Sequence, residues 1–222
     1  MKFAVNIGGG SESQCKQPRG WIGRFILRRM NASHSNLTDW GLNHISINAH
    51  NVILDVGCGG GKTISKLAAS SAKAKVYGID YSETSVAFSR KTNARRIHEG
   101  RVEIHQGSVS EMPFPDAMFD LATAVETHFW WPDLPLGMRE ILRVLQPGGT
   151  VILIAEIYKG ANTNMARLAE QYSDRTGMTL LSVDEHRALL TSAGYCDVRV
   201  IEEKAKGWIC AMGKKPGSGK SS

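Results

Sequence analysis

The 222-residue sequence lacks any long hydrophobic run. Its longest purely aliphatic stretch covers residues 151–155 and ends at Glu156, whereas a membrane-spanning helix needs about 20 predominantly apolar residues. The first ten residues include one lysine, but no continuous apolar segment leads to a small-residue cleavage site. We therefore expect neither a membrane-spanning segment nor a secretion signal.

Cysteine is also scarce. The four cysteines, Cys15, Cys58, Cys196 and Cys210, share no C-x-x-C spacing. This argues against a zinc ribbon, a disulfide framework and a thioredoxin-like redox pair. We expect reduced thiols, no metal site and a cytoplasmic protein.

Positive charge is in excess but is not concentrated. The chain has 27 lysines and arginines against 21 acidic residues, which gives a net charge of +6 and a pI of about 9.2. Such a balance can indicate binding to nucleic acid or to an anionic membrane. However, the basic residues fall into short groups near residues 24–29, 91–96 and 214–220, which is more typical of a solvated surface.

The composition changes along the chain. Residues 1–18 are polar and aperiodic, which predicts a flexible arm. Residues 19–48 predict helices over 21–30 and 37–45, because apolar residues recur there at helical spacing. Residues 49–213 alternate strand and helix patterns and form one domain, and residues 214–222 predict a flexible tail.

This alternation predicts a three-layer α/β/α sandwich around a seven-stranded, mostly parallel sheet. The predicted strands lie near residues 51–56, 74–80, 101–106, 119–126, 149–157, 196–203 and 206–213, and the helices near 62–70, 83–97, 135–145, 163–176 and 183–193. Only Lys204-Ala205-Lys206 separates the last two strands. These strands must therefore form an antiparallel hairpin.

A glycine cluster follows the first predicted strand and opens a helix. Gly57, Gly59 and Gly61 occupy the position where an α/β sheet brings backbone N–H groups and a helix N-terminus to a ligand. A dinucleotide fingerprint starting at Gly57 would need glycine at position 62, which is lysine, and the spacing is one residue short of a phosphate-binding P-loop. The cluster therefore indicates a different ligand.

Together with Asp55 this cluster reads as an acid followed by G-x-G-x-G, and further motifs come after it in order. These are Gly78-Ile79-Asp80-Tyr81-Ser82, Gln106-Gly107-Ser108, Met112-Pro113-Phe114-Pro115 with Phe119-Asp120, and Val144-Leu145-Gln146-Pro147-Gly148-Gly149. Over residues 50–213 the chain resembles the class I S-adenosylmethionine-dependent methyltransferases, in particular the type 11 group that includes ubiquinone/menaquinone methyltransferase-like enzymes. The resemblance implies a Rossmann-like fold and S-adenosyl-L-methionine as the cofactor.

The resemblance also implies a cofactor site. Its residues would be Asp55, Gly57, Cys58, Gly59, Gly61, Asp80, Tyr81, Gly107, Ser108, Val109 and Glu126. The glycines would pass under the methionine part, and Asp80 would accept hydrogen bonds from both ribose hydroxyls, as one carboxylate can. Tyr81 would flank the adenine, with Ser108 standing where the family often has an aspartate for the adenine amino group.

The acceptor side begins after the fourth predicted strand. If the extended chain continues there, Glu126 and His128 point the same way, and His128 becomes a candidate general base with Glu126 as its partner or as a ligand for acceptor or cofactor. The alternative is that Glu126 ties down the N-terminal helices and His128 is a satisfied loop histidine. Trp130 and Trp131 would form a pocket wall, or pack in the core.

Two segments are candidate lids over the site. The resemblance implies that the N-terminal helices, residues 21–30 and 34–40, cover the cofactor. Residues 158–180 are the other candidate, with Tyr158 and Tyr172 facing the acceptor. A basic amphipathic helix with Trp21 is also compatible with peripheral membrane contact, but only three cations lie within residues 21–30, which favours the lid.

We thus predict an enzyme that transfers a methyl group from S-adenosylmethionine to a small-molecule acceptor, as a monomer or homodimer. Methylation of nucleic acid is disfavoured, because the signature [DNS]-P-P-[FYW] of nucleic-acid amino methyltransferases is replaced by Glu126-Thr127-His128-Phe129. A protein that binds the cofactor without catalysis, as a sensor or scaffold, remains the alternative from another class, since the glycine motif and Asp80 serve binding only.

Overall fold

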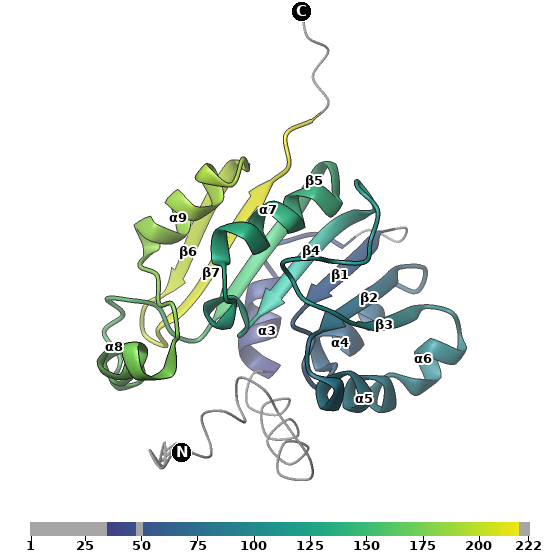
Figure 1. Cartoon of the computed structure of the whole chain (residues 1–222), viewed down its shortest axis with the longest axis horizontal. Helices are drawn as coiled ribbons and strands as arrows, with labels where there is room; N and C mark the ends of the chain where they lie inside the picture. Colours follow the sequence, from purple (N-terminus) through teal and green to yellow (C-terminus); the bar gives the residue numbers. More distant parts are fainter. Residues whose placement is uncertain (1–34, 48–50, 218–222) are drawn as a thin grey trace, which may run out of the picture.

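A seven-stranded sheet forms the centre of the computed structural model, which describes residues 35–47 and 51–217 (Figure 1). The strand order is β3-β2-β1-β4-β5-β7-β6. The strands are β1 (Val52–Val56), β2 (Lys75–Asp80), β3 (Val102–Gln106), β4 (Phe119–Val125), β5 (Leu145–Ala155), β6 (Cys196–Glu203) and β7 (Trp208–Lys214). The arm predicted over 1–18 and the helix predicted over 21–30 lie outside the described residues.

The pairing of the strands confirms the predicted sheet. The first five strands pair in parallel, whereas β7 is antiparallel to both β5 and β6. Residues 204–207 connect the last two strands, as expected from the short spacer between them. The sheet order reverses next to β1, and open α/β sheets bind ligands at the carboxyl ends of strands at such a point.

Helices cover both faces of this sheet (Figure 1). They are α3 (Ser35–Leu42), α4 (Lys62–Ser70), α5 (Glu83–Thr92), α6 (Ala94–His98), α7 (Leu134–Val144), α8 (Asn164–Thr176) and α9 (Val183–Ser192). Val151 and Leu153 of β5 pack in the core under α7 and α9, whereas Ile152 and Ile154 pack on the other side with α3 and α4. The period of two explains why both faces of β5 are apolar. None of the helices described here has the length and apolar character needed to cross a bilayer.

Helix α3 packs tightly on the sheet. Leu37 is fully buried, and Gly41 lies so close to the Ile154 side chain that a Cβ atom there would collide with it. The Trp40 ring lies 5.8 Å from the Trp208 ring. The predicted helix over 37–45 is therefore present with shifted ends, and its described part is an integral layer of the domain.

The helix predicted over residues 83–97 is divided in two at Asn93. The Asn93 side-chain amide donates to the Ser89 carbonyl and to the Gly61 carbonyl, at 3.1 and 2.9 Å. Asparagine competes with regular helix through such bonds, and here one of them reaches the glycine cluster. The prediction of one helix was wrong because this contact lies 32 residues away in sequence.

Two predicted boundaries near the carboxyl end also differ. Strand β5 begins at Leu145 rather than 149, because the Pro147-Gly148-Gly149 segment is a bulge within the strand, with Gly148 at φ 80°. The first two residues of the tail predicted over 214–222 are held in the sheet, since Lys214 belongs to β7 and the Lys215 N–H donates to the Gly149 carbonyl at 2.8 Å.

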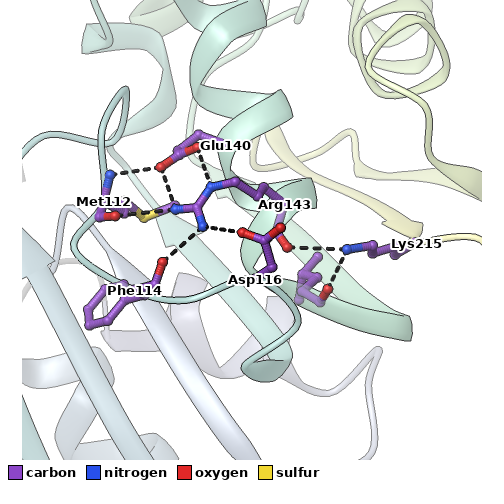
Figure 2. A network of polar contacts seen from close by, with 7 residues as sticks. Met112, Phe114, Asp116, Glu140, Arg143 and Lys215 are labelled. Carbon is purple, nitrogen blue, oxygen red and sulfur yellow. Dashed lines mark hydrogen bonds and ion pairs between the residues drawn. The ribbon is translucent and has the colours of Figure 1, made fainter.

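Arg143 of α7 anchors the loop between β3 and β4 (Figure 2). All five of its N–H donors are used: Nε and Nη2 bond both oxygens of Glu140, Nη1 bonds Asp116 and the Phe114 carbonyl, and Nη2 also bonds the Met112 carbonyl. Glu140 also accepts from the Met112 N–H at 2.8 Å. These partners raise the pKa of Arg143 and lower that of Glu140, so the pair stays charged and holds the loop.

We expect Arg143→Met to lower the free energy of unfolding by about 2 to 3 kcal/mol, because it leaves carbonyl and carboxylate acceptors without their donor. Urea unfolding at neutral pH measures this. Arg139→Met, on the exposed side of the same helix, is the control and should change stability little. Equal effects of the two substitutions would contradict the assigned role.

Candidate functional site

A cavity of about 350 Å³ opens at the carboxyl ends of β1, β2 and β4. Nine of the residues predicted for the cofactor line it: Gly57, Cys58, Gly59, Asp80, Tyr81, Gly107, Ser108, Val109 and Glu126. Asp55, Gly61 and His128 are not among the lining residues. The strand ends thus bring together residues from four separate sequence motifs.

The turn after β1 is held by the neighbouring strand. The Gly57 and Cys58 N–H groups both donate to the Ile79 carbonyl, at 2.8 and 3.0 Å. Gly57 has φ 69°, and a Cβ atom there would collide with the Thr127 side chain. Glycine is needed at this position for both conformation and space.

Gly61 was predicted to contact the ligand, but the structure requires glycine there because of the backbone conformation and the lack of space for a side chain. It caps α4 at φ 76°, and a Cβ atom would lie 2.6 Å from the Asn93 side chain and collide with the Ser89 hydroxyl. At Gly57 and Gly61, protein side chains occupy the space that a Cβ would take. The ligand therefore explains less of the glycine cluster than the sequence indicated.

Asp80 is fixed at the edge of the cavity by two backbone groups. Its Oδ2 atom accepts from the Gly59 N–H and its Oδ1 atom from the Ser82 N–H, both at 2.9 Å. Burial raises the pKa of Asp80, and these bonds work against that rise. Each oxygen keeps further acceptor capacity, so the carboxylate can still accept bonds from a diol.

Asp55 lies behind the loop rather than in the cavity. It is 2% exposed, and its Oδ1 atom accepts from the Thr123 hydroxyl at 2.7 Å. Burial raises its pKa to about 7, the Thr123 bond opposes this, and the charge of Asp80 adds to it. Its direct contact is with β4, so the geometry gives Asp55 a supporting place in the sheet.

The loop after β3 forms the wall predicted for adenine. The Gly107 N–H donates to the Asp80 carbonyl at 3.1 Å, and the Ser108 Oγ atom accepts from the Ser110 N–H at the same distance. Val109 is buried, whereas Tyr81 is 46% exposed at the rim. The Ser108 hydroxyl is thus used in a local turn, and Ser108 is one of the residues that line the cavity.

The chain changes direction at Glu126, so the expected extension through residue 128 was wrong. Glu126 has φ 58°, its N–H donates to the Ile154 carbonyl at 2.9 Å, and its Oε1 atom accepts from the Glu156 N–H. Its carboxylate therefore joins the ends of β4 and β5 while lining the cavity. A short 3₁₀ helix, η1 (His128–Trp130), follows.

His128 turns away into a buried pair with His186. The residues are 2% and 1% exposed, and their Nε2 atoms lie 3.2 Å apart. His186 Nδ1 lies 2.8 Å from the Ser182 carbonyl, which can only accept, so His186 Nε2 is the acceptor for His128 Nε2–H. Burial lowers the pKa of both imidazoles. Because His128 is buried and does not line the cavity, its position does not suit a general base.

Trp130 and Trp131 do line the cavity. The Trp131 indole N–H donates to the Thr127 hydroxyl at 3.3 Å, and Trp131 is otherwise buried. Tyr158 and Tyr172 are not among the lining residues. Tyr158 is 5% exposed and donates to Glu202 at 2.6 Å, so its expected acceptor-facing position was wrong.

Several lining residues escaped the sequence reasoning: Ser35, Thr38, Lys62, Thr63, Ser85 and Thr127. Thr127 directly follows Glu126 at the strand end, which could have indicated it. Nothing in the local pattern of α3 distinguishes Ser35 and Thr38, whose position depends on packing against β5 and β7. Their presence extends the site to the helical segment before the sheet.

The cavity can accommodate the expected S-adenosylmethionine. It offers a carboxylate at Asp80 for the ribose hydroxyls, glycine backbone beside it, and apolar side chains such as Val109 and Trp131 for flat groups. Asp80 and Glu126 give it negative charge, with Lys62 at the start of α4. Within the described ranges, no three His, Cys, Asp or Glu side chains are placed to hold a metal ion.

Comparisons with known proteins agree with this geometry. A family profile described as a methyltransferase domain matches residues 54–153. The chain is 29% identical over 192 residues to the uncharacterized methyltransferase YdaC of Bacillus subtilis (strain 168), covering 84% of this chain and 96% of YdaC. It is 32% identical over 156 residues to the O-methyltransferase cnsE of Penicillium expansum, covering 69% of this chain but only 56% of cnsE.

The fold is also shared with solved structures. A S-adenosylmethionine-dependent methyltransferase from Aquifex aeolicus superposes with a TM-score of 0.71 at 20% identity, over 86% of this chain and 98% of that one. At this identity the likeness concerns the fold alone. The chain spans little more than half the length of most of the named O-methyltransferases that it matches.

The His128–His186 pair predicts a loss of stability in mild acid. Because burial lowers both pKa values from 6.5, the unfolded chain binds protons that the folded pair does not, so the contribution of this pair to the free energy of unfolding falls as pH drops below 6.5. The raised pKa values of Asp55 and Asp80 act in the opposite direction. The slope is at most about 1.4 kcal/mol per pH unit for each imidazole. Urea unfolding between about pH 7 and pH 5 measures it.

The double substitution His128→Gln/His186→Gln should remove this contribution, so that the free energy of unfolding falls less on acidification than in the wild type, or rises. His98→Gln, at an exposed histidine, should leave it as in the wild type. An unchanged slope in the double variant would show that the pair does not titrate as its burial indicates.

Proposed function

The chain belongs to the class I S-adenosylmethionine-dependent methyltransferases, and we propose that it transfers the methyl group of this cofactor to a small-molecule acceptor, leaving S-adenosylhomocysteine. One observation carries the proposal. A single cavity joins the Gly57–Gly59 turn and Asp80, which suit the cofactor, to the Trp130–Trp131 wall, which suits an acceptor.

Methyl transfer from a sulfonium is an in-line displacement that depends on alignment and on exclusion of water. The cofactor supplies the electrophilic methyl group. In the proposed complex Asp80 would accept from the ribose hydroxyls, and the Trp130–Trp131 wall would exclude water beside the reacting groups. Glu126, which is held by the Glu156 N–H and lines the cavity, would orient an acceptor or the cofactor.

The relatives support a small-molecule acceptor. The relative cnsE is an O-methyltransferase, and another relative, 29% identical over 162 residues, is the 27-O-demethylrifamycin SV methyltransferase of Amycolatopsis mediterranei (strain S699). We extend the reaction class, not their substrates, to this chain. Since His128 is buried outside the cavity, the proposed chemistry relies on alignment. An acceptor that is nucleophilic without help from a base suits such a site best.

Asp80→Asn should weaken binding of S-adenosylhomocysteine at least about tenfold, because it exchanges a charged double acceptor for an amide with one acceptor oxygen. Isothermal calorimetry measures the affinity. Glu83→Gln makes the same change of charge at an exposed position of α5 and should bind as the wild type does. Equal affinities for all three proteins would remove Asp80 from the cofactor site.

Turnover is tested by the release of S-adenosylhomocysteine with a panel of amine, thiol and phenol acceptors. We expect release with at least one class, and its loss in Asp80→Asn at a subsaturating cofactor concentration. Cofactor binding without release on any acceptor would instead favour a sensor or scaffold.

A further inference from the structure

Four residues form a continuous row from the first turn of α7 to the cofactor loop: Gly137, Trp131, Thr127 and Gly57. We propose that this row positions the cofactor loop, with Trp131 and Thr127 as positioning residues held between two glycines. The inference rests on the proposed function, because it assigns the row to the cavity that would hold the cofactor.

The first contact is between Gly137 of α7 and the indole ring of Trp131. A Cβ atom at Gly137 would lie 2.9 Å from Trp131 Cε3 and 3.2 Å from Val109 Cγ2, well inside the usual carbon contact of about 3.5 to 4.0 Å. Glycine inside a helix costs about 1 kcal/mol relative to alanine. Here the glycine lets Trp131, on the acceptor side of the cavity, and Val109, on the adenine side, both pack closely against α7.

The second and third contacts lead to the cofactor loop. The Trp131 indole N–H donates to the Thr127 hydroxyl, and the Thr127 side chain lies where a Cβ of Gly57 would stand. A shift of the indole is therefore passed to Thr127, and from there to the first glycine of the turn. Because Trp131 is only 8% exposed and Met138 of α7 is fully buried, the row cannot relax into solvent.

Gly137→Ala tests the row at the end farthest from the cofactor loop. Gly137 does not itself line the cavity, so any effect on binding must pass through neighbouring side chains such as Trp131. The added methyl group should displace Trp131 and lower the affinity for S-adenosylhomocysteine about tenfold, since small misplacements in such sites are costly. Trp131→Phe removes the atoms nearest to that methyl group, so Gly137→Ala/Trp131→Phe should bind more tightly than Gly137→Ala alone. Calorimetry measures affinity and thermal unfolding measures stability.

A merely structural role would lower the unfolding temperature and leave the affinity unchanged, and that result would overturn the proposal. So would additive losses in the double variant. Arg139→Ala, on the exposed side of α7, is the control and should bind normally. If the wild type itself does not bind S-adenosylhomocysteine, the proposed function fails rather than the row.

A second experiment uses substitutions at Thr127 and does not depend on whether Gly137→Ala folds. Thr127→Val keeps the shape of the side chain but cannot accept from the indole, whereas Thr127→Ser keeps the hydroxyl. We expect weaker S-adenosylhomocysteine binding in Thr127→Val, near-normal binding in Thr127→Ser, and no added loss from Thr127→Val in a Trp131→Phe background. Equal affinities of Thr127→Val and Thr127→Ser would overturn the role of this bond.

Discussion

The carbonyl of Ile79 is the acceptor on which the arrangement of the site depends. By taking two N–H groups from residues 57 and 58, it bends the chain sharply at the end of β1 and sets the start of α4. The same strand delivers Asp80 one residue later, and Asp80 in turn holds the Gly59 N–H. Hydrogen bonds between two neighbouring strands thus fix the loop, which is the preorganisation that a binding site needs.

Most of the fold could be predicted from the sequence, because periodicity reports burial. The alternation of β5 between the two faces of the sheet and the short spacer before β7 are local signals, and both led to correct topology. The errors occurred where a distant partner decides the local structure. Asn93 ends a helix through a bond to Gly61, and the bulge at Gly148 lies within a strand rather than before it.

The residues of the candidate site also fall into those that local sequence motifs predicted and those that depend on distant contacts. Residues on the glycine turn and on the ends of β2 and β3 were predicted because their motifs have a fixed order, and they do line one cavity. Beyond β4 the period-two rule failed at a single residue. Glu126 takes a positive φ that non-glycine residues rarely adopt, and this one dihedral angle sends His128 into the core beside His186.

The bond from Asn93 to the Gly61 carbonyl has a consequence for local motion. It connects the end of the glycine turn to the junction of α5 and α6, on the opposite face of the sheet from Trp131. Opening of the turn must therefore break the Asn93 bond or fray the end of α5. The two segments form one cooperative unit of local unfolding, and hydrogen exchange of their amide protons should report a common free energy of opening.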